Sequence, residues 1–282
     1  MPLVIVPTPI GNLEDITLRA IRTLREADII ACEDTRRTSI LLQNFHIKTK
    51  TISYHSFNEK ERADNLIERL NRGETVALVS DAGTPGICDP GYVIINHVIQ
   101  EGIPITVLPG ACAAVSALVA SGFSNRPFLF VGFLPDKTGD RRRFLQSLVN
   151  HPWVMIFYLS PHKALKHLET IIEVLGNRQA VLCREISKIY EEFYRSDLEQ
   201  MLERVRTDGV RGEMVLVIED VDLPMEGHQS IWQGQTGKLY MEGLSEKTIV
   251  NLVTDQFHIP RNVVKRYIAE LKKLDKNEPE VL

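Results

Sequence analysis

The chain has 282 residues, of which 44% are hydrophobic and 25% are charged, a length that suggests roughly two domains and a composition typical of soluble globular proteins. Its 33 lysines and arginines stand against 37 aspartates and glutamates, a formal net charge of -4, which excludes a general attraction to nucleic acid, so any basic surface must be local. The four cysteines are widely spaced and form no C-x-x-C pair, which argues against a metal site or a disulfide framework and favours reduced thiols in a cytoplasmic protein.

The first 123 residues alternate between short apolar runs and amphipathic segments. The chain opens on a strand, not on a signal peptide, and no apolar run is long enough to span a membrane. Strands are expected at Leu3–Val6, Ile29–Cys32, Thr51–Ser53, Val76–Val79 and Ile103–Leu108. Helices are expected at Ile16–Ala27, from a capping box at Asn58 and Glu61 to Gly73, at Gly91–Glu101 and at Ala111–Ser121. This alternation predicts a mainly parallel sheet that is covered on both faces.

One glycine- and proline-rich loop, Ser80–Gly91, follows the apolar run Val76–Val79. Its small residues let a ligand approach main-chain N–H groups, and a loop after a parallel strand lies where open α/β folds hold their ligands. Asp89-Pro90 at its end reads as a helix start, with an acceptor at the N-cap and proline at the first helical position. A tight strand-to-helix connection without a ligand is the alternative interpretation.

The pattern pauses at Ser124–Pro127 and then restarts with closer strands, which predicts a second α/β domain, residues 124–220, with a mixed sheet. Strands are expected at Phe128–Phe133, Trp153–Tyr158, Arg178–Cys183, Phe193–Arg195 and Glu213–Ile218, with a basic loop at Leu134–Arg143 and helices after Ser160-Pro161 and at Ser196–Val205. Residues 221–282 form the third part. There the polar, glycine-containing segment Asp220–Thr236 reads as a linker, and Ser245–Val253 and Arg261–Leu271 as amphipathic helices.

Read together, the turn motifs resemble those of a known family. They are Val6–Leu13, Glu33–Arg36, Ser80–Gly91, Leu108–Gly110, Gly132–Pro135, Arg184-Glu185 and Gly212–Val217. In this order they are similar to the small-subunit ribosomal RNA methyltransferase I group of the tetrapyrrole methylase superfamily, including its small helix-turn-helix-like tail. The resemblance implies two α/β domains with an S-adenosylmethionine cleft between them. It also implies a homodimer, and methyl transfer to the ribose 2′-hydroxyl of a cytidine in the decoding region of 16S rRNA, within the small ribosomal subunit.

Such a methyl transfer is an in-line displacement, so the protein must chiefly hold the reactants in position, and rigid turns suit that task. The expected cofactor contacts are the backbone around Gly83, Thr84, Ile87, Gly110 and Ala111, walls formed by Pro9 and by Tyr158 and Leu159, and adenine packing by Met214. Ordinary turn geometry and core packing are the alternative. The family often has glutamate at position 159, so Leu159 argues against a catalytic role there.

A ribose hydroxyl needs a base within about 2.6 to 3.2 Å to become a good nucleophile. Candidates at strand ends are Asp34, His55, Asp81 and Glu185. Histidine is a common general base, but a lone histidine beside aromatic residues, as His55 is, is more often structural. The two aspartates are equally readable as helix caps or loop supports, and Glu185 as a surface salt bridge with Lys188. The sequence selects no single base.

The basic residues that could contact RNA are concentrated in two segments of the chain. Lys137, Arg141, Arg142 and Arg143 are expected to contact RNA phosphates near the cleft mouth. The tail carries further cations, for which RNA contact and a solvated helix face stay open: Arg261, Lys265, Arg266, Lys272 and Lys273. Two other functions remain. A small-molecule methyltransferase acting on a tetrapyrrole would not need the basic run or the tail, and a non-enzymatic nucleotide-sensing module would need no base.

Overall fold

The structure is a computed structural model that describes residues 2–123, 127–149, 151–221, 225–257 and 261–275. It divides into two compact units, Met1–Asp220 and Val221–Leu282. The expected pause at Ser124–Pro127 and the turn at Ile259-Pro260 lie largely outside the described residues, as does the side chain of Lys273. None of the described helices is long and apolar enough to cross a lipid bilayer.

The first sheet is wholly parallel, as the alternating pattern predicted, with strand order β3-β2-β4-β1-β5. Its strands are β1 (Leu3–Ile5), β2 (Ile29–Cys32), β3 (Thr51–Ser53), β4 (Val76–Val79) and β5 (Ile105–Val107). Residues of β1, β2 and β4 are buried on both sides of the sheet, which explains their uninterrupted apolar runs. The carboxyl ends of all five strands therefore share one edge of the sheet, where the predicted ligand loop also begins.

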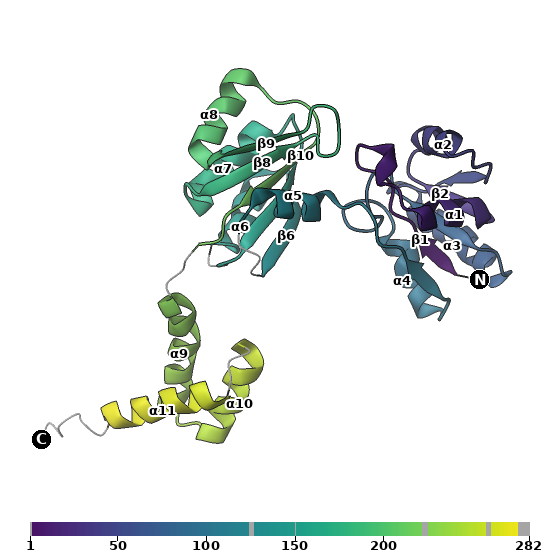
Figure 1. Cartoon of the computed structure of the whole chain (residues 1–282). Helices are drawn as coiled ribbons and strands as arrows, with labels where there is room; N and C mark the ends of the chain where they lie inside the picture. The colour runs from purple at the N-terminus through teal and green to yellow at the C-terminus, as the bar shows by residue number, and fades with distance from the viewer. Residues whose placement is uncertain (1, 124–126, 150, 222–224, 258–260, 276–282) are drawn as a thin grey trace, which may run out of the picture. The chain divides into compact units, whose positions relative to one another are not determined.

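Helices cover both faces of this sheet (Figure 1). On one face, α1 (Leu18–Glu26) and α2 (Thr35–Asn44) pack Leu24 and Leu42 against β1, β2 and β4. On the other, α3 (Glu59–Asn71) and α4 (Tyr92–Gln100) pack Leu66 and Ile94. The expected capping box is wrong, because the Asn58 carboxamide accepts from the backbone N–H of His55 at 2.8 Å and caps no helical N–H.

The second sheet is mixed, as predicted, in the order β6-β7-β10-β8-β9. Its strands are β6 (Phe128–Phe133), β7 (Val154–Leu159), β8 (Gln179–Arg184), β9 (Glu192–Asp197) and β10 (Met214–Ile218). Only β6 and β7 run parallel, and the other neighbours are antiparallel. Three helices cover one face: α6 (Thr138–Gln146), α7 (Ala164–Leu175) and α8 (Leu198–Asp208).

Helix α5 (Ala113–Ser121) covers the opposite face of the second sheet, where Ala114 and Ala117 pack against Val154, Val181 and Val215. By packing, α5 belongs to the second sheet, although it precedes residue 124. The structure gives Met1–Asp220 as one compact unit, so the expected division of this part after residue 123 stays a prediction. The small side chains of α5 let it lie close to the strands.

Three predicted connections are wrong in detail. The basic run lies in α6 and not in a loop. Helix α4 begins at Tyr92 with Gly91 at its N-cap, so Asp89 does not cap it. The expected linker contains most of α9 (Met225–Met241), which packs with α10 (Glu246–Phe257) and α11 (Arg261–Asp275). Trp232 is buried in that small core beside Tyr267, so tertiary burial outweighs the weak helix propensity of the segment.

Candidate active site

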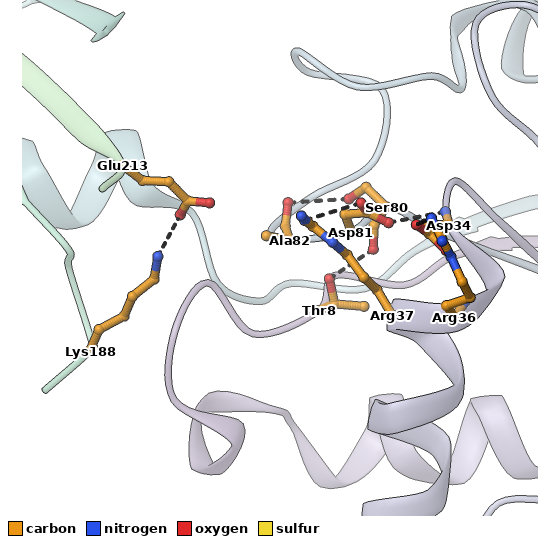
Figure 2. Close-up of polar contacts among 9 residues, drawn as sticks. All are labelled: Thr8, Asp34, Arg36, Arg37, Ser80, Asp81, Ala82, Lys188 and Glu213. Carbon is orange, nitrogen blue, oxygen red and sulfur yellow. Dashed lines mark hydrogen bonds and ion pairs between the residues drawn. The ribbon is translucent and has the colours of Figure 1, made fainter. Parts of the chain in front are cut away.

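Two loops at the carboxyl edge of the first sheet are held together by hydrogen bonds. Thr8, just after β1, exchanges two backbone hydrogen bonds of 2.9 Å with Gly83 in the loop after β4. The Thr8 hydroxyl also donates to the Ser80 carbonyl at 3.1 Å (Figure 2). Gly83 has φ +79°, a conformation that favours glycine because it has no Cβ. The hydrogen bonds fix the main chain of the glycine-rich loop relative to β1.

A cavity of about 350 Å³ opens at this edge, within the unit Met1–Asp220. Loop residues of the first half line one side of it: Ile10, Ala82, Gly83, Thr84, Ile87, Cys88 and Asp89. Strand ends and the start of α5 line the other side: Cys112, Ala113, Phe133, Tyr158, Leu159, Ser160, Pro161, Ile186, Glu213, Met214 and Val215. A concave, mostly apolar site with a few polar groups is the usual form of a small-molecule pocket.

Tyr158 is the aromatic centre of the pocket wall. Its ring meets Phe133 edge-to-face at a centroid distance of 5.4 Å and Phe130 at 5.1 Å, an arrangement that aromatic quadrupoles favour. Burial raises the pKa of the Tyr158 phenol, and the neighbouring Cys112 and Cys88 raise it further. The phenol therefore stays neutral at physiological pH and offers the pocket a flat, uncharged surface.

The sequence matches the family model of the tetrapyrrole (corrin/porphyrin) methylases over residues 2–202. A ribosomal RNA small subunit methyltransferase I from Halalkalibacterium halodurans is 42% identical over 274 residues, which cover 95% of each chain. The chain belongs to the tetrapyrrole methylase family.

Solved structures agree with this fold assignment. Diphthine synthase matches with a TM-score of 0.64 at 16% identity, covering 81% of this chain and 94% of that one. A uroporphyrin-III C-methyltransferase from Thermus thermophilus, in complex with S-adenosylhomocysteine, matches with a TM-score of 0.57 at 18% identity, covering 78% and 97%. At such low identity these matches show the fold alone, and the predicted tetrapyrrole methylase-like architecture is confirmed.

The predicted cofactor contacts of this family member divide into two groups. Six of them line the cavity: Gly83, Thr84, Ile87, Tyr158, Leu159 and Met214. The other three, Pro9, Gly110 and Ala111, do not. Ala111 supports the wall indirectly, because its carbonyl accepts from the Thr84 hydroxyl at 3.2 Å, and a Cβ on Gly110 would lie 2.6 Å from that of Pro7.

The two candidate aspartates of the first half form an ion-paired cluster beside the cavity (Figure 2). Asp34 caps α2 through the backbone N–H of Arg36, and the Arg36 side chain pairs with it at 2.9 Å. This side-chain hydrogen bond, with the backbone one, lowers the pKa of Asp34 to about 2. Asp81 accepts from the Asp34 backbone N–H at 3.1 Å and pairs with Arg37 at 3.3 Å. Neither carboxylate lines the cavity. The Asp34 carboxylate caps α2, and the Asp81 carboxylate holds the loops after β2 and β4 together.

The other two candidate bases are also engaged elsewhere. His55 lies after β3 in edge contact with Phe57, and it does not line the cavity. Glu185 has φ +52° and accepts from the Glu213 backbone N–H at 2.8 Å and from Lys188 Nζ at 3.0 Å. The Glu213 N–H first, and Lys188 as well, lower the pKa of the Glu185 carboxyl. Lys188 also pairs with the Glu213 carboxylate at 3.0 Å (Figure 2).

Sequence reasoning missed several lining residues. Phe133 and Glu213 stand inside quoted family motifs, and Asp89 stands inside the glycine-rich loop, where it was interpreted as a helix cap. Motif membership was the available signal for all three, but it does not say which side chain faces the cavity. Among the described residues, no cluster of three or more His, Cys, Asp or Glu side chains is arranged to hold a metal ion.

The predicted RNA contacts also divide. Arg141 is 3% exposed, and its guanidinium donates to Thr170, Thr138 and the carbonyls of Pro135 and Asp136. It therefore fixes the start of α6 against α7 and does not present charge to solvent. The remaining three residues are exposed and form what we call the α6 cation patch: Lys137, Arg142 and Arg143.

Proposed function

We propose that this chain is an S-adenosylmethionine-dependent methyltransferase that modifies the ribose 2′-hydroxyl of a cytidine in the decoding region of 16S rRNA. The observation that carries the proposal is the end-to-end similarity to a ribosomal RNA small subunit methyltransferase I, 42% identical across 95% of both chains. Because that alignment covers the second unit as well as the pocket, the likeness extends beyond the features that all tetrapyrrole methylases share.

The cavity suits such a cofactor in size and charge. Its volume of about 350 Å³ is within the range of small-molecule sites. Its described lining contains no lysine or arginine, so no positively charged side chain in the wall repels a sulfonium cation. When bound, S-adenosylmethionine supplies an electrophilic methyl group. Gly83 and Thr84 would hold the cofactor through the main chain, with Tyr158 and Met214 packing against its flat parts.

The chain's contribution to the transfer is mainly positional. The paired loops of Thr8 and Gly83 fix one wall, and the strand ends at Leu159 and Met214 fix the other. Holding two reactants in line in this way can lower a barrier by about 7 to 11 kcal/mol. The apolar lining also limits the access of water, which strengthens the electrostatic interactions within the site.

The α6 cation patch supports an RNA substrate at this site. Strands β6 and β7 are parallel neighbours, so their carboxyl ends share an edge, and Phe133 and Leu159 at those ends line the cavity. Lys137 follows β6 by four positions and makes no ion pair with another described residue. Arg142 and Arg143 pair with exposed Glu173 and Asp140, and phosphates can displace such weak surface partners.

We also propose a homodimer that acts in the cytoplasm, where ribosomal subunits are found. Helix α5 supports self-association, because Val115 and Val119, one turn apart, are 52% and 77% exposed. In a homodimer, such an exposed apolar helix face would be covered by the second chain. Sedimentation equilibrium tests the proposal: a mass of one chain at micromolar concentration would contradict it, and Val119→Glu should shift a dimer toward monomer.

The decisive experiment measures methyl transfer from labelled S-adenosylmethionine to small ribosomal subunits that lack the modification, followed by nuclease mapping. Alkali-resistant label at a single cytidine is the expected result. The control is Thr84→Arg, which places a large cation in the cavity and should abolish cofactor binding in calorimetry without unfolding the chain. Tight cofactor binding by the wild type without label would favour a small-molecule methylase or a nucleotide sensor, and label on a base would contradict the 2′-hydroxyl assignment.

A further inference from the structure

The cavity offers two carboxylates, and they differ in their surroundings. Glu213 pairs with Lys188 at 3.0 Å, and its side chain is 69% exposed. Asp89 is half-buried and forms no ion pair with any residue in the described part of the chain. A carboxylate that is neutralised by a lysine is a weaker proton acceptor than one without a cation. Asp89 is therefore the better placed of the two to accept a proton inside the cavity.

Asp89 is also free of the structural role that its sequence context suggested. Helix α4 begins at Tyr92, and its N-cap is Gly91, with φ +147°. The Asp89-Pro90 pair thus belongs to the loop, and no helical N–H claims the carboxylate. Asp89 lines the cavity together with Cys88 and Tyr158.

The groups around Asp89 favour proton uptake. Burial raises the pKa of its carboxyl, a hydrogen bond with Ser80 partly offsets this effect, and the negative charge of Asp81 raises the pKa further. Asp89 in turn raises the pKa of Glu33, Cys88 and Tyr158, which lie close enough to feel its charge. Arg37, which lowers the pKa of Glu33, pairs with Asp81 at 3.3 Å and is not among the groups that shift the pKa of Asp89.

We propose that Asp89 is the general base that removes the proton from the ribose 2′-hydroxyl. The inference rests on the proposed function. In the step, the hydroxyl oxygen bonds to the methyl carbon as the carbon–sulfur bond breaks and leaves its electron pair on sulfur. The hydroxyl proton passes to a carboxylate oxygen of Asp89 and then to water. A base of this kind is needed because a neutral hydroxyl is a poor nucleophile.

The other candidate carboxylates fit this role less well. Asp34, Asp81 and Glu185 are each paired with a basic side chain, and none lines the cavity. His55 does not line it either. Asp34 caps α2, and Asp81 and Glu185 each join two loops, whereas Asp89 combines a place in the cavity wall with a carboxylate that no described cation neutralises.

The test compares Asp89→Asn with Asp89→Glu and with Asp208→Asn, a matched change at an exposed residue of α8. Asp89→Asn should lower the single-turnover rate on small ribosomal subunits by about 10²- to 10⁴-fold, with the cofactor dissociation constant unchanged in calorimetry. Asp89→Glu should restore part of the rate, and Asp208→Asn should match the wild type. The wild-type rate should fall as the pH drops through the pKa of Asp89, because the protonated carboxyl accepts no proton, and Asp89→Asn should lack this limb.

Three outcomes would overturn the inference. A full rate in Asp89→Asn would show that another group takes the proton. An equal loss of rate and cofactor affinity would make Asp89 a cofactor ligand and not a base. An acidic limb that persists in Asp89→Asn would assign the titration to a different group. A wild type that binds cofactor but labels no RNA would instead refute the proposed function, and the role of Asp89 with it.

Discussion

Gly110 gives a quantitative test of how the pocket loops are held. A Cβ at this position would lie 2.6 Å from Pro7 Cβ and 2.9 Å from Pro7 Cγ, whereas ordinary contacts are 3.4–4 Å. The proline ring is fixed to the backbone and cannot rotate away, so in Gly110→Ala the loops after β1 and β5 must separate. Overpacking of this kind costs about 1–3 kcal/mol, which for a unit of this size lowers Tm by about 2–12 °C.

The same displacement should reach the pocket. Ala111 accepts from the Thr84 hydroxyl at 3.2 Å, and Cys112 and Ala113 line the cavity, so a shift at Gly110 should also weaken cofactor binding. Calorimetry measures both effects, on unfolding and on titration with cofactor. The matched control is Gly139→Ala in α6, where no atom lies within 4 Å of the added Cβ and stability should rise by about 0.5–1 kcal/mol. A Gly110→Ala variant that melts and binds like the wild type would refute the reasoning.

Three further predictions concern charge. Lys188→Met should lower the free energy of unfolding by about 1 kcal/mol at pH 7. Because folding lowers the pKa of the Glu185 carboxyl, the difference in unfolding free energy between wild type and Lys188→Met should vanish as the pH falls through that pKa. Denaturant melts at several pH values measure it, and a difference that does not change with pH would contradict a stabilising ion pair between Lys188 and Glu185. Replacing the α6 cation patch with alanines should weaken RNA binding and flatten the logarithmic salt slope by about two units; an unchanged slope would remove the patch from the interface. Folding raises the pKa of Asp89, so the stability of the folded protein falls as the pH rises from the unfolded-state pKa through the folded-state pKa. Asp89→Asn should therefore melt no lower than the wild type at pH 7. A lower Tm would show that the carboxylate stabilises the fold.

The central strands of the first sheet were predictable because a strand that is buried on both faces carries apolar residues at every position. Ile29–Cys32 and Val76–Val79, buried at every position, begin and end where the apolar runs do. Helix starts were less predictable. Asp89-Pro90 has the composition of a cap, but the chain needs two more residues, including Gly91 at φ +147°, to turn from the loop into α4. The preference of Asp-Pro for a helix start is outweighed there by the backbone conformation of the pocket loop, which delays the start of α4.

Charge was the least predictable property, because composition counts cations without saying which are buried. Arg141 and Arg142 are neighbours in sequence, yet one is saturated by hydrogen bonds between α6 and α7 and the other faces solvent. Both arginines lie in α6, which was predicted to be a loop. A loop has no regular periodicity from which one side chain would be expected to be buried and the next exposed. Helical periodicity places adjacent residues about 100° apart around the axis, which is sufficient to divide a basic run between core and surface.

The sequence already indicates which acidic residues form ion pairs, because some of them have a basic residue a few positions away. Asp34 is followed two positions later by Arg36, and Glu185 three positions later by Lys188, and in the structure each pair is joined. A local cation neutralises such a carboxylate and commits it to holding a loop. Positions 73 to 125 contain no lysine or arginine, so Asp89 stands in the longest part of the first half where no cation is near in sequence. A carboxylate that the fold both draws into a cavity and leaves without a described cation retains the capacity to accept a proton, and this combination distinguishes Asp89 from the acids that stabilise its surroundings.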